Sequence, residues 1–408
     1  MSDGPPIASG LPQAPADGTH DAGDTGPVGR PAGLRGATVV LGRAVLQVLP
    51  AWVVARVVVT LALVVARTGA STLRPGDPGA VARAHQGLLA WDAGWYHSIA
   101  DHGYVGAGRE SVRFFPLFPL LGRCIGDVPG VGTGAALVLV ANLSALLAMA
   151  ALWLLVRHDL GDTALARRSV WLLALAPSGY ALVLAYSDAL LLLCSVVTVL
   201  GARTGRWWWA AAAGLAAGLD RPVGVLLLVP VAVEVWLQRR DPVGTGGWSA
   251  RFAALVAPVA GAGAYLAWVG HRFGDPWLPL TVQQQDGHRG RLAVPLRAMG
   301  HDVWSALHGH HLGSALHIPW IVLCLALVVV AWRRLPTSYA ALATAVLVVS
   351  LSSSNLDSFE RYALGAFPLV VAASTCTARR RMEQGVLVLS GLVMAGYAIL
   401  AFVGAVVP

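Results

Sequence analysis

The stretch from Thr133 to Val156, TGAALVLVANLSALLAMAALWLLV, contains no charged residue, and charges begin directly after it at Arg157. About 20 mainly apolar residues are enough to cross the hydrocarbon core of a bilayer as a helix. This stretch therefore predicts a membrane-spanning helix that ends where the first arginine follows it.

Runs of the same kind recur along most of the chain. Of 408 residues, 56% are hydrophobic and only 12% are charged, and the mean hydropathy is +0.65. Soluble domains of this length do not combine so much apolar surface with so few charges. We therefore predict an all-α, polytopic membrane protein with about eleven spans, at 44–67, 133–156, 169–185, 187–202, 207–219, 222–238, 252–270, 317–332, 336–351, 362–377 and 384–405.

The arginines indicate how these spans are oriented. All 29 basic residues are arginine, and many of them cluster in short loops between spans, as expected for loops that stay in the cytoplasm. The same distribution argues against a nucleic-acid partner, because the charges flank the spans and form no continuous stripe. The clusters are Arg157, Arg167 and Arg168; Arg203 and Arg206; Arg239, Arg240 and Arg251; Arg333 and Arg334; and Arg379, Arg380 and Arg381.

The sequence divides into an N-terminal tail and a membrane domain, and we expect the protein in the cell membrane. Residues 1–36 are rich in Gly, Pro, Asp and Ala and have no apolar period, so we expect a disordered cytoplasmic tail. Residues 37–408 form the membrane domain, with two long loops, 68–132 and 271–316, on the extracytoplasmic side. The polar residues that interrupt the apolar runs also fall on that side, which predicts one external site at the membrane surface.

The first of these loops carries the stretch Trp91-Asp92-Ala93-Gly94-Trp95-Tyr96 just beyond the first span. A carboxylate among aromatic rings next to a membrane is typical of chemistry or ligand binding. The alternative is an interfacial aromatic anchor that carries one solvated acid. We predict that Asp92 is a general base, because that role needs an ionisable oxygen in a partly apolar setting.

Four further positions are candidates for ligand binding, each with a structural alternative. Arg113 could hold a phosphate in bidentate fashion or extend toward lipid headgroups. Asp188 follows Tyr186 and Ser187 and could simply cap a helix. Arg221 follows Asp220 in an apolar stretch, where the two could form a structural ion pair. Arg361, which precedes Tyr362, could hold an anionic headgroup or form a salt bridge with Asp357 or Glu360.

The sequence shows no established metal or nucleotide motif. The four cysteines are far apart, so no disulfide framework or zinc finger is expected. Most histidines lie on the predicted external loops, including His308, His310 and His311, but their spacing matches no tight ligand pattern. Solvated loop histidines are the simpler interpretation, and a divalent metal is the alternative. No Gly-rich phosphate loop supports a cytosolic nucleotide-sugar donor.

The order of several motifs resembles the PIG-V-like mannosyltransferases, membrane enzymes of the GT-C glycosyltransferase superfamily. The similarity covers about 44–380, although no single motif decides it. It rests on Trp91–Tyr96, Ile99–Tyr104, Phe114–Leu121, Ala185–Leu190, Gly218–Gly224, Phe273–Trp277 and Ser358–Pro368.

This resemblance implies a GT-C-like bundle that transfers mannose from a polyprenyl-phosphate-mannose donor. The acceptor would be an extracytoplasmic glycolipid, glycan or protein. By the same resemblance, Asp92 deprotonates the acceptor hydroxyl, and an arginine near the membrane holds the donor phosphate, without a choice among Arg113, Arg221 and Arg361. The substrate-binding candidates are Trp91, Trp95, Tyr96, His102, Arg113, Asp188, Arg221, Arg361 and Tyr362.

Two other classes of function stay open. A transporter or flippase of a lipid-linked sugar would also gather polar groups in broken helices. Such a protein should show internal repeats and charges near the bilayer midplane, and the sequence shows neither. A non-catalytic subunit of a glycan-assembly complex is compatible with the same sequence.

Overall fold

The computed structural model describes residues 33–240, 246–285, 290, 293, 300, 304, 317–356 and 358–407. Residues 1–32 of the predicted tail lie outside this set, as do His308, His310 and His311 of the second loop. Residues 33–36, which we assigned to the tail, belong instead to the first helix, because the helical backbone begins at Gly33.

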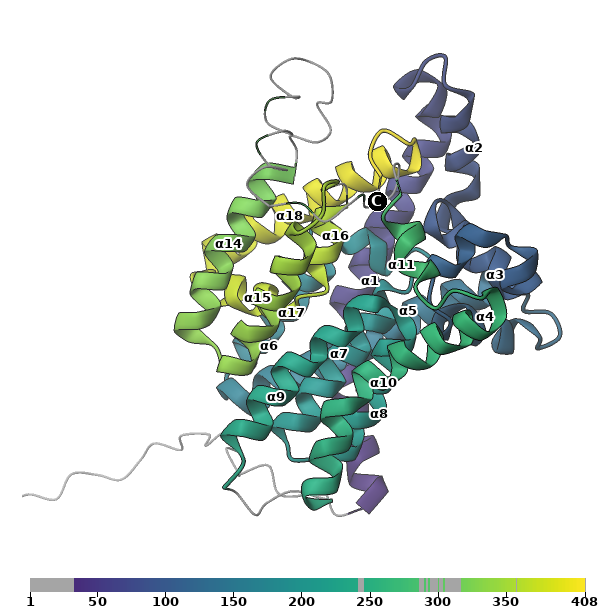
Figure 1. Ribbon diagram of the computed structural model, residues 1–408. Coiled ribbons are helices and arrows are strands. Elements are labelled where there is room, and N and C mark those ends of the chain that lie inside the picture. The colour runs from purple at the N-terminus through teal and green to yellow at the C-terminus, as the bar shows by residue number, and fades with distance from the viewer. Residues whose placement is uncertain are drawn as a thin grey trace, which may run out of the picture. The chain divides into compact units, whose positions relative to one another are not determined.

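The described residues form helices and contain no β-strand (Figure 1). This confirms the all-α prediction. The α-helices are α1 (Gly33–Leu73), α2 (Pro78–Gln86), α3 (Asp92–Gly106), α4 (Leu117–Gly126), α5 (Thr133–Leu160), α6 (Thr163–Ala174), α7 (Asp188–Arg203), α8 (Trp207–Asp220), α9 (Leu228–Leu237), α10 (Gly247–Phe273), α11 (Leu278–Gln283), α14 (His317–Arg334), α15 (Thr337–Leu351), α16 (Phe359–Leu364), α17 (Phe367–Cys376) and α18 (Arg380–Phe402). Short 3₁₀ helices are η1 (Gly87–Leu89), η2 (Arg109–Arg113), η3 (Gly179–Leu182) and η4 (Pro222–Leu227).

Among the described helices, five are long and apolar enough to cross a membrane: α1, α5, α10, α14 and α18. The other predicted spans coincide at least in part with helices, but these helices are shorter than a full crossing. The chain is therefore a multi-pass membrane protein, while the number of eleven crossings stays a prediction.

Burial separates a central helix from peripheral ones. In α5, 61% of the apolar window is buried, against 28% in α1, 22% in α18 and 17% in α14. Large apolar side chains on the outer helices, such as Leu61 and Leu392, are exposed. A helix that is apolar all round and buried belongs to the core, whereas exposed apolar faces are suited to lipid.

Glycines allow α8 and α10 to pack with their backbones nearly in contact. A Cβ atom at Gly218 would lie 2.1 Å from the Pro258 carbonyl oxygen, and one at Gly261 would lie 2.2 Å from that of Leu215. Helix pairs in membranes use such small residues to approach closely. The result is a tightly packed pair that ends at Asp220, directly before Arg221.

The predicted span 169–185 is not one helix. Helix α6 ends at Ala174, three residues before Pro177, and the chain continues through irregular backbone and η3. Proline lacks the amide hydrogen that a continuing helix needs, and it disfavours helical geometry in the residue before it. The difference matters because irregular backbone within a membrane protein must find its hydrogen bonds elsewhere.

Side chains from two neighbouring helices supply part of those bonds. The Arg56 guanidinium donates through Nη2 to the Leu182 carbonyl oxygen at 3.2 Å and through Nε to Asn142 Oδ1 at 2.9 Å. Asn142 Nδ2 in turn donates to the Val183 carbonyl oxygen at 3.0 Å. These contacts fix the irregular segment against α1 and α5 just ahead of Asp188.

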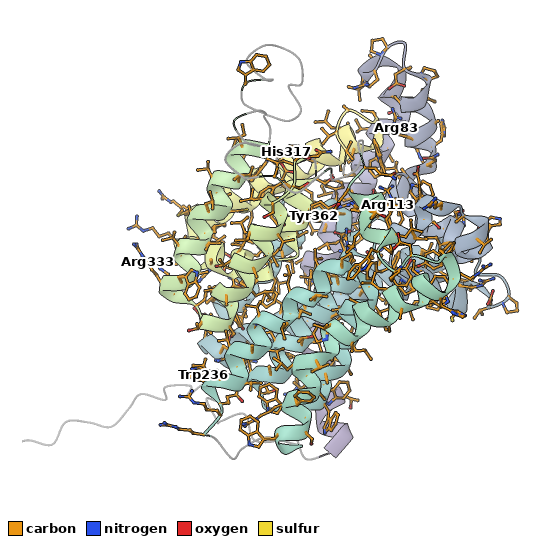
Figure 2. All side chains as sticks on the ribbon, in the orientation of Figure 1. Arg83, Arg113, Trp236, His317, Arg333 and Tyr362 are labelled. Atoms are coloured by element: carbon orange, nitrogen blue, oxygen red, sulfur yellow. The ribbon has the colours of Figure 1, made fainter. Side chains whose placement is uncertain are left out.

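Residues predicted to lie on opposite sides of the membrane are found at opposite ends of the bundle. In Figure 2, Trp236 lies toward one end and His317 and Arg83 toward the other. The first end was predicted to be cytoplasmic and the second external. The structure separates them along the bundle, and the sidedness itself stays a prediction.

A buried polar network ties four helices together at the end that holds Trp236. Arg203 of α7 contacts Asp159 of α5 through Nε at 3.0 Å and Glu234 of α9 through Nη1 at 3.2 Å. The Tyr339 hydroxyl of α15 donates to Asp159 at 2.7 Å. The Asp159 and Glu234 side chains are 0% and 1% exposed, so their charges depend on these partners.

We predict that Arg203→Met destabilises the fold strongly. Removing one partner of a buried ion pair costs on the order of 3–5 kcal/mol, because the remaining charge is left without compensation. Thermal unfolding in detergent measures the effect. The control is Arg206→Met, three residues further along the chain, where the side chain is exposed. Equal melting temperatures for the two variants would contradict the prediction.

Candidate active site

Four charged residues from distant parts of the chain meet at the ends of four helices. Asp92 is the first residue of α3, and Asp188 is the first residue of α7. Arg221 directly follows α8, and Arg361 lies on the short helix α16. Sequence analysis named all four as candidates, and the structure brings them into contact.

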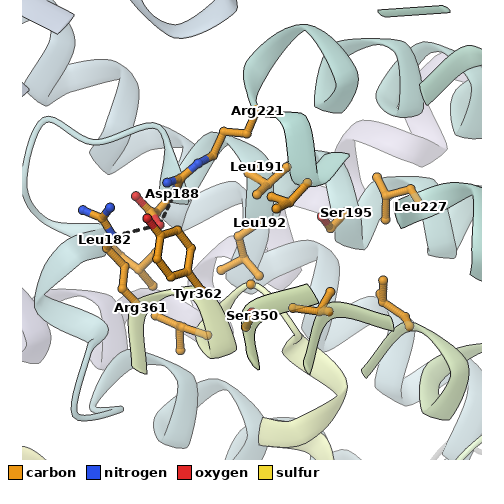
Figure 3. Close-up of a pocket in the computed structure, with 15 residues that line it drawn as sticks. Leu182, Asp188, Leu191, Leu192, Ser195, Arg221, Leu227, Ser350, Arg361 and Tyr362 are labelled. Carbon is orange, nitrogen blue, oxygen red and sulfur yellow. Dashed lines mark ion pairs between the residues drawn. The ribbon is translucent and has the colours of Figure 1, made fainter. Parts of the chain in front are cut away.

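The four side chains form a chain of alternating charges. Arg361 Nη2 lies 2.8 Å from Asp92 Oδ2, and Arg361 Nε lies 3.8 Å from Asp188 Oδ1. Arg221 Nη1 lies 2.5 Å from the same Asp188 oxygen. Figure 3 shows Arg221 and Arg361 converging on Asp188 beside Tyr362. The Asp188 carboxylate therefore separates two guanidinium groups that would otherwise repel each other.

Arg361 has more hydrogen-bond donors than it uses. Its side chain is only 5% exposed, and its Nε and Nη1 atoms are buried without a hydrogen-bond partner. The rings of Tyr186 and Tyr362 lie 5.0 Å and 5.3 Å from the guanidinium carbon, a distance suited to cation–π attraction. A guanidinium carries five donors in a planar fork, so this one can accept an anionic ligand.

The backbone before Asp92 is strained. Trp91 has a φ of 62°, a left-handed value that is uncommon for a residue with a side chain. Its indole Nε1 donates to the Ala401 carbonyl oxygen of α18 at 2.9 Å. Surrounding contacts of this kind are what keep a strained residue in place. Trp91 thus helps to fix the backbone from which the Asp92 side chain extends.

Tyr96 links α3 to the start of α7. Its hydroxyl is 2.7 Å from Ser187 Oγ, and its ring packs edge-on against Phe114 and Phe118. Burial raises the pKa of Tyr96, so it stays a neutral phenol. Tyr96 therefore positions the two acidic helix starts and does not act as a base.

An apolar groove leads away from the charged residues. The groove is narrow, with a cavity volume of about 30 Å³. The polar groups of Asp188, Arg221, Arg361 and Tyr362 lie at one end (Figure 3). The remaining lining is mostly aliphatic and comes from α7, η4 and α15: Leu191, Leu192, Val223, Leu227, Leu342 and Val346.

Other candidates lie apart from this charge chain. His102 is exposed on α3. Arg113 stacks on the rings of Trp95 and Phe114, at 5.7 Å and 4.7 Å, and makes no ion pair with the four charges. Asp220 is fully buried, and neither of its carboxylate oxygens has a hydrogen-bond partner. Trp95 and Arg113 therefore form a neighbouring aromatic and basic cluster.

Sequence analysis missed two contributions to the site. Leu342 and Val346 of α15 line the groove, yet they sit in an ordinary apolar run and carry no local signal. The carboxylate of Glu360 pairs with His317, and the two residues are 43 positions apart. Among the described residues, no cluster of three or more His, Cys, Asp or Glu side chains could hold a metal ion.

Comparison with known proteins identifies a family. Residues 116–355, more than half of the chain, match the family model of glycosyltransferase family 87. No curated protein sequence matches the chain significantly. The family match and the long apolar helices confirm the prediction of a membrane glycosyltransferase. The more specific PIG-V-like resemblance is not confirmed.

Solved structures align with the chain at low identity. ArnT from Cupriavidus metallidurans bound to undecaprenyl phosphate has 16% identity over 86% of this chain and 76% of its own, with a TM-score of 0.45. The apo form of ArnT from Cupriavidus metallidurans has 15% identity over 76% of this chain and 71% of its own, with a TM-score of 0.44. The Archaeoglobus fulgidus oligosaccharyltransferase in complex with zinc and sulfate has 14% identity over 83% of this chain and 53% of its own, with a TM-score of 0.40.

We predict that Asp188→Asn lowers the melting temperature much more than Asp92→Asn does. Asp188 is 11% exposed and faces both guanidinium groups, whereas Asp92 is 29% exposed and faces one. Loss of the buried central charge should cost on the order of 3–5 kcal/mol. Thermal unfolding of the two purified variants provides the comparison, and an equal or reversed order would show that Asp188 does not hold the arginines together.

Proposed function

The chain belongs to glycosyltransferase family 87, and from this premise we propose that it uses a polyprenyl-phosphate-sugar donor. In this proposal the sugar is transferred to a hydroxyl group of an acceptor outside the cytoplasm, with Asp92 as general base. Mannose is the proposed sugar on the strength of the motif resemblance alone. The acceptor is a glycolipid, a glycan or a protein.

The observation that carries the donor proposal is the pairing of two buried guanidinium groups with an apolar groove. A lipid phosphate has one anionic group and a long hydrocarbon tail, and the site offers one place for each. Arg221 and Arg361 would hold the phosphate oxygens, and the aliphatic side chains of α7, η4 and α15 would contact the first isoprene units. Arginine suits this role because its fork matches phosphate oxygens in pairs.

The same arrangement accounts for the proposed chemistry. Asp92 takes the proton from the acceptor hydroxyl, and the acceptor oxygen attacks carbon 1 of the sugar. The bond between that carbon and the phosphate oxygen breaks, and polyprenyl phosphate leaves with the bonding electrons. Arg361 touches the base and faces the phosphate site, so its charge stabilises the leaving group as negative charge develops there.

Arg361 also gives Asp92 a defined orientation before substrate binds. The 2.8 Å contact occupies one carboxylate oxygen and leaves the second available. A carboxylate accepts hydrogen bonds on both oxygens, so the free one can receive the hydroxyl of an acceptor. A general base has to be within hydrogen-bond reach of its proton, and this geometry presents it at the edge of the buried cluster.

We predict that Asp92→Asn abolishes transfer and leaves the fold intact. The amide keeps the shape of the carboxylate and loses its basicity, and loss of a general base typically lowers the rate by about 10²–10⁴-fold. Membranes incubated with radiolabelled polyprenyl-phosphate-mannose and candidate acceptors report the transfer. Asp101→Asn, nine residues along α3 and on its exposed side, is the matched control. Activity of the Asp92 variant near that of wild type would refute the assignment.

The external placement of the site has a separate test that uses native cysteines. Cys124 of α4 lies in the first loop, and Cys376 at the end of α17 precedes the cluster Arg379 to Arg381; both are exposed. A membrane-impermeant maleimide should label Cys124 in intact cells and Cys376 only after permeabilisation. Cys124→Ser and Cys376→Ser variants identify each signal, and labelling of both residues from the same side would rule out the proposed orientation.

A further inference from the structure

Arg361 is carried by a short helix that depends on its neighbours for its position. Helix α16 has only six residues, and only two residues separate it from α17. The residue before it, Ser358, has a φ of 63°, a left-handed value that is uncommon for a residue with a side chain. A helix this short gains little stability from its own hydrogen bonds. Contacts with other segments of the bundle must therefore hold α16 in place.

Those contacts converge on Glu360, the residue directly before Arg361. Each oxygen of its carboxylate lies 2.8 Å from Nδ1 of His317, the first residue of α14. The Tyr397 hydroxyl of α18 donates to Oε1 at 3.4 Å. The backbone oxygen of Glu360 accepts a hydrogen bond at 2.8 Å from the Ser178 hydroxyl, which lies in the irregular segment before η3. Three separate segments of the bundle therefore hold the one residue next to Arg361.

The pair of Glu360 and His317 is buried, and its surroundings are fixed as well. The Glu360 side chain is 9% exposed and that of His317 is 4% exposed. The Trp320 indole, three residues along α14 from His317, donates to the Tyr397 oxygen at 2.9 Å. A buried polar group that loses its partner is costly, so these groups do not part readily. Glu360 is thus kept in one place.

Glu360 does not neutralise the guanidinium beside it. Sequence analysis gave Asp357 and Glu360 as possible ion-pair partners of Arg361. Asp357 lies outside the described residues, and no ion pair forms between Glu360 and Arg361, which are both described. Adjacent residues of a helix point in different directions. Glu360 pairs with His317, whereas Arg361 reaches Asp92 at 2.8 Å. One residue anchors the helix, and the next one faces the candidate site.

We propose that His317 and Glu360 are a positioning pair, which directs Arg361 toward the anionic group of its ligand. The inference rests on the proposed function, in which Arg361 holds the donor phosphate. Neither member of the pair lines the apolar groove, so both act through α16. A guanidinium matches phosphate oxygens with two parallel hydrogen bonds, which require a fixed orientation as well as a charge. A displaced α16 therefore binds phosphate more weakly, although Arg361 keeps its charge.

The test is a double-mutant cycle on the purified full-length protein, with decaprenyl phosphate as the probe and Kd values from microscale thermophoresis. His317→Ala should raise the Kd about tenfold, the equivalent of one buried hydrogen-bonded contact. Arg361→Lys should also raise the Kd, and binding stays measurable because lysine keeps the charge. In the Arg361→Lys background, His317→Ala should have little further effect, because the pair acts through the guanidinium fork that lysine lacks.

Two further variants separate positioning from general stability. Tyr397→Phe removes a single hydroxyl from the anchor and should raise the Kd by a smaller factor, about threefold. It carries the same cycle if His317→Ala does not fold. The matched control is Ser374→Ala, which removes a buried 2.8 Å hydrogen bond to Ser169 between α17 and α6. This control should lower the melting temperature and leave the Kd unchanged.

The outcomes that overturn the inference differ from those that overturn the proposed function. A wild-type Kd in both anchor variants would remove the positioning role. Additive effects of His317→Ala and Arg361→Lys would assign the pair to general stability, as would an equal loss of affinity in Ser374→Ala. If wild-type protein does not bind decaprenyl phosphate, or if Arg361→Lys leaves its Kd unchanged, the proposed function itself falls.

Discussion

The site depends on how charge is compensated where water is scarce. Two guanidinium groups, Arg221 and Arg361, are almost fully buried, and a buried charge is tolerated only when opposite charge and hydrogen bonds surround it. Asp188 supplies that charge between them, and Asp92 supplies it at the outer end. The compensation is incomplete at Arg361, where donors remain unused. That shortfall is the reason why we propose the cluster as the binding site of an anion.

The rest of the bundle keeps these few residues in register. Each charged residue sits at or near the end of a helix, where the chain can turn without leaving a long stretch of unpaired backbone in an apolar environment. The irregular segment before Asp188 depends on Arg56 and Asn142 for hydrogen bonds to its carbonyl groups. The side chains of Arg56 and Asn142 within the helices thus stabilise irregular backbone, whereas the charged side chains at the helix ends form the proposed site.

Much of the helical layout was predictable, because apolar runs near 20 residues have few alternatives in a membrane protein. The interruptions were harder to place. Helix α6 breaks off three residues before Pro177, and α16 and α17 are divided at Ala366, directly before the first turn of α17, which contains Pro368. A count of apolar residues does not register such local changes. Hence the predicted span 169–185 is partly irregular in the structure.

The candidate residues were predictable as a set but not as a constellation. A charge in an apolar sequence is conspicuous, so Asp92, Asp188, Arg221 and Arg361 could be named from sequence. Which of them pair depends on contacts between segments that are tens to hundreds of residues apart. For the same reason the partnership of His317 with Glu360 left no mark in either local sequence. The sequence identifies charged residues whose burial costs free energy, and only the packed structure shows which partners compensate them.

The hydrogen bond from Trp91 to the Ala401 carbonyl oxygen has a consequence for how the protein is made. The two residues are 310 positions apart. Membrane helices are inserted in the order in which the ribosome delivers them, so α18 arrives long after α3. A nascent chain can hold nearly all of the bundle and still lack the support for its first loop. Assembly of the site is thereby tied to the synthesis of α18, and translation products that stop before this helix lack the hydrogen bond that holds Trp91.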